Sequence, residues 1–141
     1  MPVRLLIPRI GVNAVIESVG ETSNGQMAVP QRVQDVAWYA PGIVPGHPGD
    51  AVISGHLDWY TGPAVFQHLG SMHDGDTVTV QFADASSVTF DVTESTSYPV
   101  QAEPGYLFQA GGPAQLSLIT CAGSWGGSQY TQRLVVNATT T

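Results

Sequence analysis

Glycine and proline divide this chain into short segments. Its 141 residues include 16 glycines and 10 prolines, and these are spread along the whole length. Both residue types interrupt helices and are favoured in turns, so this spacing leaves little room for long helices and favours many short strands. We therefore expect an all-β fold, mainly β with one or two short helices.

Local hydrophobic patterns predict where these strands lie. Apolar and polar residues alternate over Thr77–Phe82 and again over Val88–Thr93, which predicts an antiparallel hairpin closed by residues 83–87. Pro63–Leu69 has the apolar spacing of a short helical turn, and residues 94–114 are predicted to form an irregular loop, a candidate wall of a substrate groove. Further apolar runs predict strands at residues 3–8, 12–16, 37–39, 51–56, 116–121 and 132–138.

Charge and hydrophobicity limit the class of protein. The chain is 43% hydrophobic and only 11% charged, which favours a packed globule, and its length suits a single domain over residues 1–141. A net charge of −7 repels phosphate backbones, so we expect no nucleic-acid partner. No apolar run approaches the ~20 residues of a membrane span, and no signal pattern follows Met1. We expect a soluble domain, with any membrane attachment made by an anchor that is absent from this chain.

Cys121 is the only cysteine, so the chain cannot form an internal disulfide. It follows a strand-like apolar run and precedes Ala122-Gly123-Ser124, a placement typical of a strand end. A thiolate at such a position can act as a nucleophile, whereas a free cysteine alone more commonly packs as a small apolar residue. Its neighbours therefore decide between these two roles.

His56 and Arg133 are the candidate partners of Cys121. His56 ends the apolar run of residues 51–56, and imidazole is the commonest general acid and base near neutral pH. Arg133 opens the last predicted strand, and its guanidinium could hold a substrate carbonyl or a developing oxyanion. The other three histidines are expected on the solvated surface, and the spacing of histidine, cysteine and acidic residues shows no metal-site motif.

The combination of these motifs resembles the sortase family. Residues 117–121, Ser-Leu-Ile-Thr-Cys, are similar to the TLxTC motif of sortases, with Ser117 where the motif usually has Thr. Residues 53–56, Ile-Ser-Gly-His, and Arg133 are similar to the other two parts of the sortase active site, in the same order. The resemblance extends over nearly the whole chain and is greatest to the class E and F sortases of Actinobacteria and related bacteria.

This resemblance implies a closed sortase-type β-barrel of mostly antiparallel strands, and a cysteine transpeptidase that needs no cofactor. Cys121 would attack the Thr–Gly bond of an LPxTG-like sorting signal and form a thioacyl intermediate, while His56 transfers protons and Arg133 stabilises charge. An amine acceptor, a cell-wall precursor or a pilin lysine, would then receive the protein at the extracellular face of the membrane. Thr120 and Trp125 are the candidate substrate-binding residues.

Two other interpretations remain open from the sequence. An L,D-transpeptidase also uses Cys and His on a β-rich fold, but its motif places the two close together, which this chain does not do. A non-catalytic β-barrel binding module would keep Cys121 in its core.

Asp58, two residues after His56, could orient the imidazole only if the strand continued past Gly55.

Overall fold

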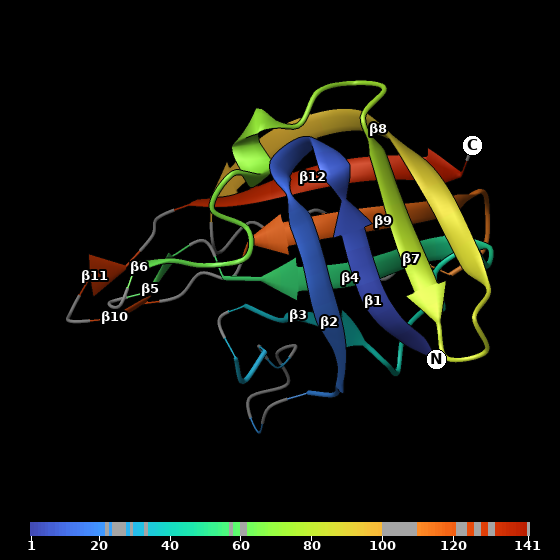
Figure 1. Ribbon diagram of the computed structural model, residues 1–141, viewed down its shortest axis with the longest axis horizontal. Coiled ribbons are helices and arrows are strands. Elements are labelled where there is room, and N and C mark those ends of the chain that lie inside the picture. The colour runs from blue at the N-terminus through green and yellow to red at the C-terminus, as the bar shows by residue number, and fades with distance from the viewer. Residues whose placement is uncertain are drawn as a thin grey trace.

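Eight strands close into a barrel in the order β1-β2-β3-β4-β9-β12-β8-β7 (Figure 1). The computed structural model describes residues 1–21, 23, 28, 30–32, 34–56, 58–59, 62–99, 110–120, 124–125, 128–129 and 132–140, with the backbone alone at 58–59, 62–63, 98–99, 124–125, 128–129 and 132–133. The barrel strands are β1 Pro2–Ile7, β2 Val12–Val19, β3 Val36–Tyr39, β4 Gly49–Gly55, β7 Thr77–Phe82, β8 Ser87–Pro99, β9 Ala114–Thr120 and β12 Gln132–Thr140.

Short elements complete the chain outside this sheet. Two-residue strands pair as β5 (Asp58–Trp59) with β6 (Gly62–Pro63), and as β10 (Ser124–Trp125) with β11 (Ser128–Gln129). The helical content of the described residues is two single-turn 3₁₀ helices, η1 (Pro8–Ile10) and η2 (Leu69–Ser71). The predicted fold class, an all-β closed barrel with little helix, is confirmed.

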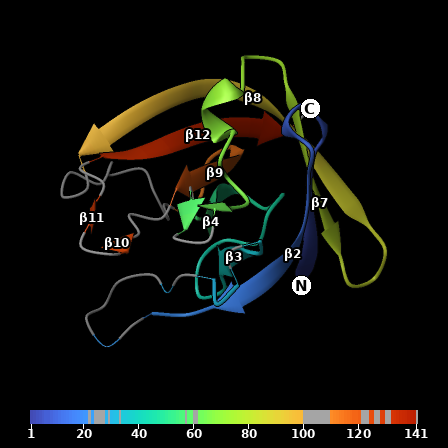
Figure 2. The same ribbon diagram turned by 60° about the vertical axis from the view of Figure 1, so that its left-hand side comes forward.

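Most neighbouring strands are antiparallel, with β2–β3 and β4–β9 as the parallel pairs. The predicted hairpin is present, because β7 and β8 pair from Thr77 opposite Asp91 to Gln81 opposite Ser87. On its other side β8 pairs with β12 along nine residues, and Figure 2 shows these two long strands side by side. The sheet therefore brings the C-terminal strand β12 between β9 and β8.

The interior of the barrel is apolar, and every second residue of a strand points its side chain into it. Leu5 and Ile7 of β1, Val78 and Val80 of β7, and Phe90 of β8 are fully buried in this core. The burial pattern of β2 alternates over its first five residues, as expected for a strand with one face to the core and one to solvent. Period-2 hydrophobicity therefore placed these strands correctly.

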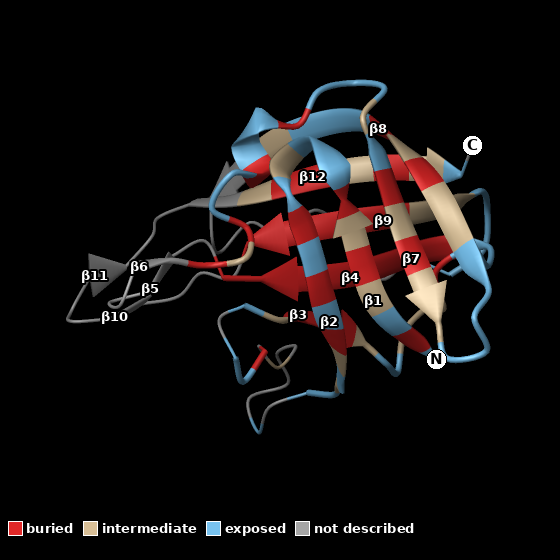
Figure 3. Cartoon of the chain, viewed as in Figure 1, coloured by how far each residue is buried: buried red, intermediate tan, exposed pale blue. Residues whose placement is uncertain are grey.

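Strand β4 and most of β9 are buried on both faces (Figure 3). Ala51 and Ile53 of β4 point into the core cluster. Val52 and Ser54 alternate with them and are only 1% and 3% exposed, although they lie on the outer face of the barrel. Continuous burial explains why residues 51–53 of this strand form an unbroken apolar run in the sequence.

Two local predictions were wrong in part. Residues 94–99 were expected to be irregular, but they extend β8, whose backbone pairs with β12 although the side chains of Thr93, Glu94 and Ser95 are exposed. Backbone pairing with a long partner strand replaced the missing apolar pattern. The helical turn expected at Pro63–Leu69 lies later, at Leu69–Ser71, where Leu69 is its only buried side chain.

Candidate active site

The ends of β4 and β9 lie side by side at one end of the barrel. The two strands are parallel and in register, from Gly49 opposite Ala114 to Gly55 opposite Thr120. Each is therefore followed directly by a predicted catalytic residue, since His56 comes after Gly55 and Cys121 comes after Thr120. Both strands point toward the side of the barrel from which β5, β6, β10 and β11 project (Figure 1).

Strand β12 begins at the same end of the barrel. It runs antiparallel to β9, with Val135 opposite Ile119. Arg133, two residues earlier, lies near the start of β12 as expected, and its backbone pairs with Tyr98 of β8. Its side chain and the whole of Cys121 lie outside the described residues, so their separation stays a prediction.

His56 is held from two directions just beyond β4. Its imidazole Nε2 lies 3.2 Å from the carbonyl oxygen of Pro30, and its backbone carbonyl accepts a hydrogen bond of 2.9 Å from the N–H of Phe66. The side chain is only 6% exposed, more deeply placed than the exposed strand end that the sequence predicted. Because a carbonyl can only accept, this contact favours the neutral tautomer with hydrogen on Nε2.

Gly55 allows the chain to pass close to Phe66. A Cβ atom at residue 55 would lie 2.7 Å from Phe66 Cδ2 and 2.9 Å from Val65 Cγ1, both too close for any side chain. Phe66 is fully buried in the barrel core. The glycine before His56 thus lets an aromatic ring close the end of the core directly beneath the site.

The segment that contacts His56 is attached to β2 through Glu17. Glu17 Oε1 accepts a 3.0 Å hydrogen bond from the N–H of Gln31, and Oε2 accepts one of 3.3 Å from the N–H of Arg32. Burial alone would raise the pKa of Glu17, but these two N–H groups and a hydrogen bond from Asp35 outweigh it, so the pKa lies below its ordinary value. Burial, and then the Glu17 carboxylate, raise the pKa of Asp35.

A buried polar network lies on the outer face of β4, β9 and β12. Ser117 Oγ lies 2.8 and 3.0 Å from the two carboxylate oxygens of Asp50, to which it donates, and it accepts a hydrogen bond of 3.0 Å from Asn137 Nδ2. Asp50 is 3% exposed and Ser117 is fully buried. This network joins the three strands whose ends carry the predicted catalytic residues.

The two candidate substrate-binding residues have different surroundings. Thr120 is 3% exposed, and its Oγ1 accepts a 3.0 Å hydrogen bond from the backbone N–H of Leu134. This bond extends the contact between β9 and β12 beyond their last backbone pair. The backbone of Trp125 lies in β10, and its side chain is outside the described residues. A role for either residue in substrate binding stays a prediction.

The remaining polar candidates are exposed or lie outside the described residues. His47, His68 and His73 are exposed, as the sequence predicted. Within the described part of the chain, no three His, Cys, Asp or Glu residues are placed to hold a metal ion. The side chain of Asp58 is outside the described residues. In the portion that the structure describes, no helix is long and apolar enough to span a membrane.

Sequence reasoning missed the residues that support His56. Pro30 contacts His56 through its backbone carbonyl, which the type of side chain does not reveal. Glu17 lies on β2, and a long connection to β3 separates it in sequence from the residues that it binds. The network of Asp50, Ser117 and Asn137 did leave a signal. Ser117 is a polar residue inside an apolar run and Asp50 directly precedes one, and polar residues that are buried require a partner.

Comparison with known proteins identifies the barrel. The model of the sortase domain family matches residues 5–141. Sortase C1 from Streptococcus agalactiae superposes with a TM-score of 0.75 at 19% identity, over 99% of this chain and 66% of that one. Sortase A from Corynebacterium diphtheriae gives 0.75 at 17% identity, over 99% and 60% of the two chains.

Sortase C-1 from Actinomyces oris matches with a TM-score of 0.74 and 23% identity, over 100% of this chain and 75% of that one. The chain thus spans about two thirds of the length of these solved structures. No curated protein sequence matches it significantly. The likeness to solved structures concerns the fold, and the family model covers almost every residue. On this evidence the chain belongs to the sortase family.

Proposed function

We propose that residues 1–141 form one catalytic domain, a cysteine transpeptidase that acts on LPxTG-like sorting signals at the cell surface. The observation that carries this proposal is the register of Gly55 opposite Thr120, which brings together the ends of the two strands that His56 and Cys121 follow in the sequence. If the alternation continues by one residue, Cys121 and Arg133 share the outer face with Ile119 and Val135, and His56 shares it with Ser54.

The proposed reaction has two acyl-transfer steps. The Cys121 thiolate attacks the threonine carbonyl carbon of the sorting signal, and the C–N bond to glycine breaks as His56 gives a proton to the leaving amine. The resulting thioester is then attacked by an amine whose proton passes to His56, and the thiolate leaves. Arg133 stabilises the oxyanion in both steps.

The acceptor amine would be a cell-wall precursor or a pilin lysine. We also propose that the protein is a class E or F enzyme, on the strength of its sequence motifs. The solved structures named above are class A and class C enzymes at low identity. A comparison of cleavage rates on LPxTG and variant signal peptides would test the class assignment.

The mechanism is tested with a fluorogenic LPxTG peptide and an amine, by comparing wild type with Cys121→Ala and Arg133→Ala. We expect Cys121→Ala to lower kcat/KM at least about a thousandfold, because the nucleophile is lost. Arg133→Ala should lower it by about a hundredfold to a thousandfold, as for other oxyanion contacts. Mass spectrometry should detect the thioacyl intermediate on the wild type alone.

Arg9→Ala is the matched control for Arg133→Ala. Arg9 is half exposed and makes one long ion pair, 3.9 Å, with Asp76, so its loss should leave turnover unchanged. Equal turnover by wild type and Cys121→Ala would contradict the proposal. A thiol that resists alkylation in the folded protein would instead favour the binding-module alternative.

A further inference from the structure

One peptide group lies between Glu17 and His56. Its carbonyl belongs to Pro30 and lies 3.2 Å from His56 Nε2, while its N–H belongs to Gln31 and lies 3.0 Å from Glu17 Oε1. In a trans peptide the C=O and N–H groups point in opposite directions. The carboxylate and the imidazole therefore sit on opposite sides of the same planar group, joined by two hydrogen bonds.

This arrangement has a defined effect on the imidazole. A carboxylate that accepts from a peptide N–H polarises the group, so that its carbonyl becomes a stronger acceptor. The stronger acceptor favours a proton on Nε2, both in the neutral ring and in the imidazolium. In the neutral ring the lone pair then resides on Nδ1, which leaves that nitrogen to exchange protons in the proposed reaction.

The contacts are placed to keep this geometry. Pro30 and His56 are both buried, so water competes little for the hydrogen bond between them. Glu17 also accepts a hydrogen bond from the N–H of Arg32, so its carboxylate holds two consecutive residues of the segment. The rigid φ of Pro30 further restricts the peptide group.

We propose that Glu17 is a positioning residue for His56, acting through the Pro30–Gln31 peptide group to hold the imidazole with Nε2 protonated and Nδ1 as its base. This inference rests on the proposed transpeptidase function. It gives His56 the support that a carboxylate gives to the histidine of a Ser-His-Asp triad, with one peptide group in between. It also replaces Asp58 as the residue that orients the ring.

Other charged groups surround this carboxylate. Asp35 hydrogen-bonds to Glu17, and Arg32 interacts with both of them electrostatically. Arg4, on the neighbouring strand β1, acts on Asp35. The ionisation of all these groups depends on pH. Both tests therefore compare the variants at one fixed pH near neutrality, so that residue 17 is the only group that differs between them.

The first test reads the imidazole directly. Nitrogen-15 NMR of a Cys121→Ala protein, in which no turnover occurs, should show neutral His56 as the Nε2–H tautomer. Adding Glu17→Ala should speed solvent exchange of that proton by about tenfold, the effect of losing one charge-assisted hydrogen bond. Glu17→Gln, which keeps an acceptor without the charge, should fall between the two.

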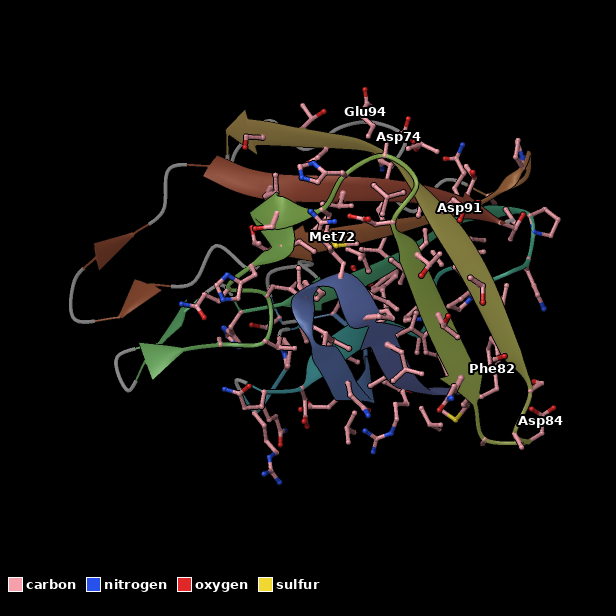
Figure 4. All side chains as sticks on the ribbon, turned by 45° about the horizontal axis from the view of Figure 1, so that its top comes forward. Met72, Asp74, Phe82, Asp84, Asp91 and Glu94 are labelled. Carbon is pink, nitrogen blue, oxygen red and sulfur yellow. The ribbon has the colours of Figure 1, made fainter. Side chains whose placement is uncertain are left out.

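The matched control is Glu94→Gln. Glu94 is exposed on β8, away from the Glu17 side of the barrel, and Figure 4 shows it among the acidic side chains of the β7–β8 region. This variant should leave the tautomer and the exchange rate unchanged. A neutral His56 with hydrogen on Nδ1, or an exchange rate unaffected by Glu17→Ala and Glu17→Gln, would overturn the proposal.

The second test reads catalysis in proteins with Cys121 intact. Glu17→Ala should lower kcat about tenfold and leave KM nearly unchanged, because a misoriented base affects the chemical steps. Glu17→Gln should recover part of this loss. Normal kcat in both variants would overturn the proposal, as would a loss of thermal stability without any change in the Nε2–H signal.

The two tests separate this inference from the function on which it rests. If the wild type fails to turn over peptide but His56 shows the expected tautomer and exchange, the transpeptidase function is wrong and the positioning role of Glu17 is correct. If the wild type turns over peptide but residue 17 has no effect on the imidazole or on kcat, the function stands and the positioning role of Glu17 is wrong.

Discussion

Ser117 shows how one hydroxyl supports three strands. It lies on β9, contacts the Asp50 carboxylate on β4 and accepts from the Asn137 side chain on β12. Sortases usually have threonine at this position, and serine supplies the same hydroxyl with one methyl group fewer. The residue shares its face of β9 with Ile119.

Ser117→Ala should lower the free energy of unfolding by about 1–3 kcal/mol. The substitution removes a hydrogen bond from a buried carboxylate, and buried polar groups are costly to leave short of partners. Urea unfolding followed by fluorescence measures the change. Ser95→Ala on the exposed part of β8 is the control and should stay within about 0.5 kcal/mol of wild type. An equal effect of both variants would contradict a role for the network.

At the scale of secondary-structure elements, the connection between β2 and β3 has the clearest effect on the candidate site. It leaves the barrel after Val19, returns at Val36, and on its way places the Pro30 carbonyl against His56. Two carboxylates, Glu17 and Asp35, lie close together at its base. The connection is therefore attached to the barrel by a pair of acidic residues whose ionisation affects its stability.

Asp35→Asn should stabilise the protein at pH 7 and lose this advantage in acid. The folded-state pKa of Asp35 is raised, by burial and then by Glu17, so ionised Asp35 carries a penalty above that pKa. The penalty disappears as the pH falls through the raised pKa to below the ordinary value of ~3.9. Thermal unfolding of both proteins at pH 7 and pH 3 measures the effect.

Asp74→Asn, on the exposed turn before β7, is the matched control for this substitution. It should leave the difference between the two pH values as in wild type. A gain from Asp35→Asn that is the same at pH 3 and pH 7 would show that the ionised pair with Glu17 is not its cause.

The success of sequence reasoning also differed between elements. Strands with one face in the core, such as β7, were predictable because alternation records their burial. The end of β8 was not, because residues 94–99 are held by backbone pairing with β12 and carry no apolar pattern. The support of His56 was equally hidden, since it depends on a main-chain carbonyl. The order of motifs predicted the family, and the side-chain geometry around Cys121 remains a prediction.

For the molecule as a whole, the closed sheet sets which strands are most secure. Every barrel strand has two neighbours, but β4 and most of β9 are also buried on both faces, whereas alternate residues in the first part of β2 face solvent. Acidic side chains such as Asp74, Asp91 and Glu94 gather over the β7–β8 region, where they give that side a negative charge (Figure 4). The candidate site thus rests on the most buried part of the sheet.

Amide hydrogen exchange should reproduce this order. We expect the slowest exchange in β4 and β9, which open only with global unfolding, and faster exchange in β2, whose parallel contact with β3 spans four residue pairs. Exchange measured by NMR or mass spectrometry under native conditions tests this. Faster exchange in β4 than in β2 would contradict the assignment of the stable centre to β4 and β9.

The parallel pairing of β4 with β9 also affects the order of folding. The two strands are separated by a connection that contains η2, β7 and β8, so their contact is among the least local in the chain. Such contacts form late, because a long loop must close before any pairing energy is gained. The strand ends that precede His56 and Cys121 in the sequence would then meet only when the barrel is nearly complete. If Cys121 and His56 act together as proposed, a chain that is still folding would carry its thiol without the imidazole, and reactivity would begin only with the finished fold.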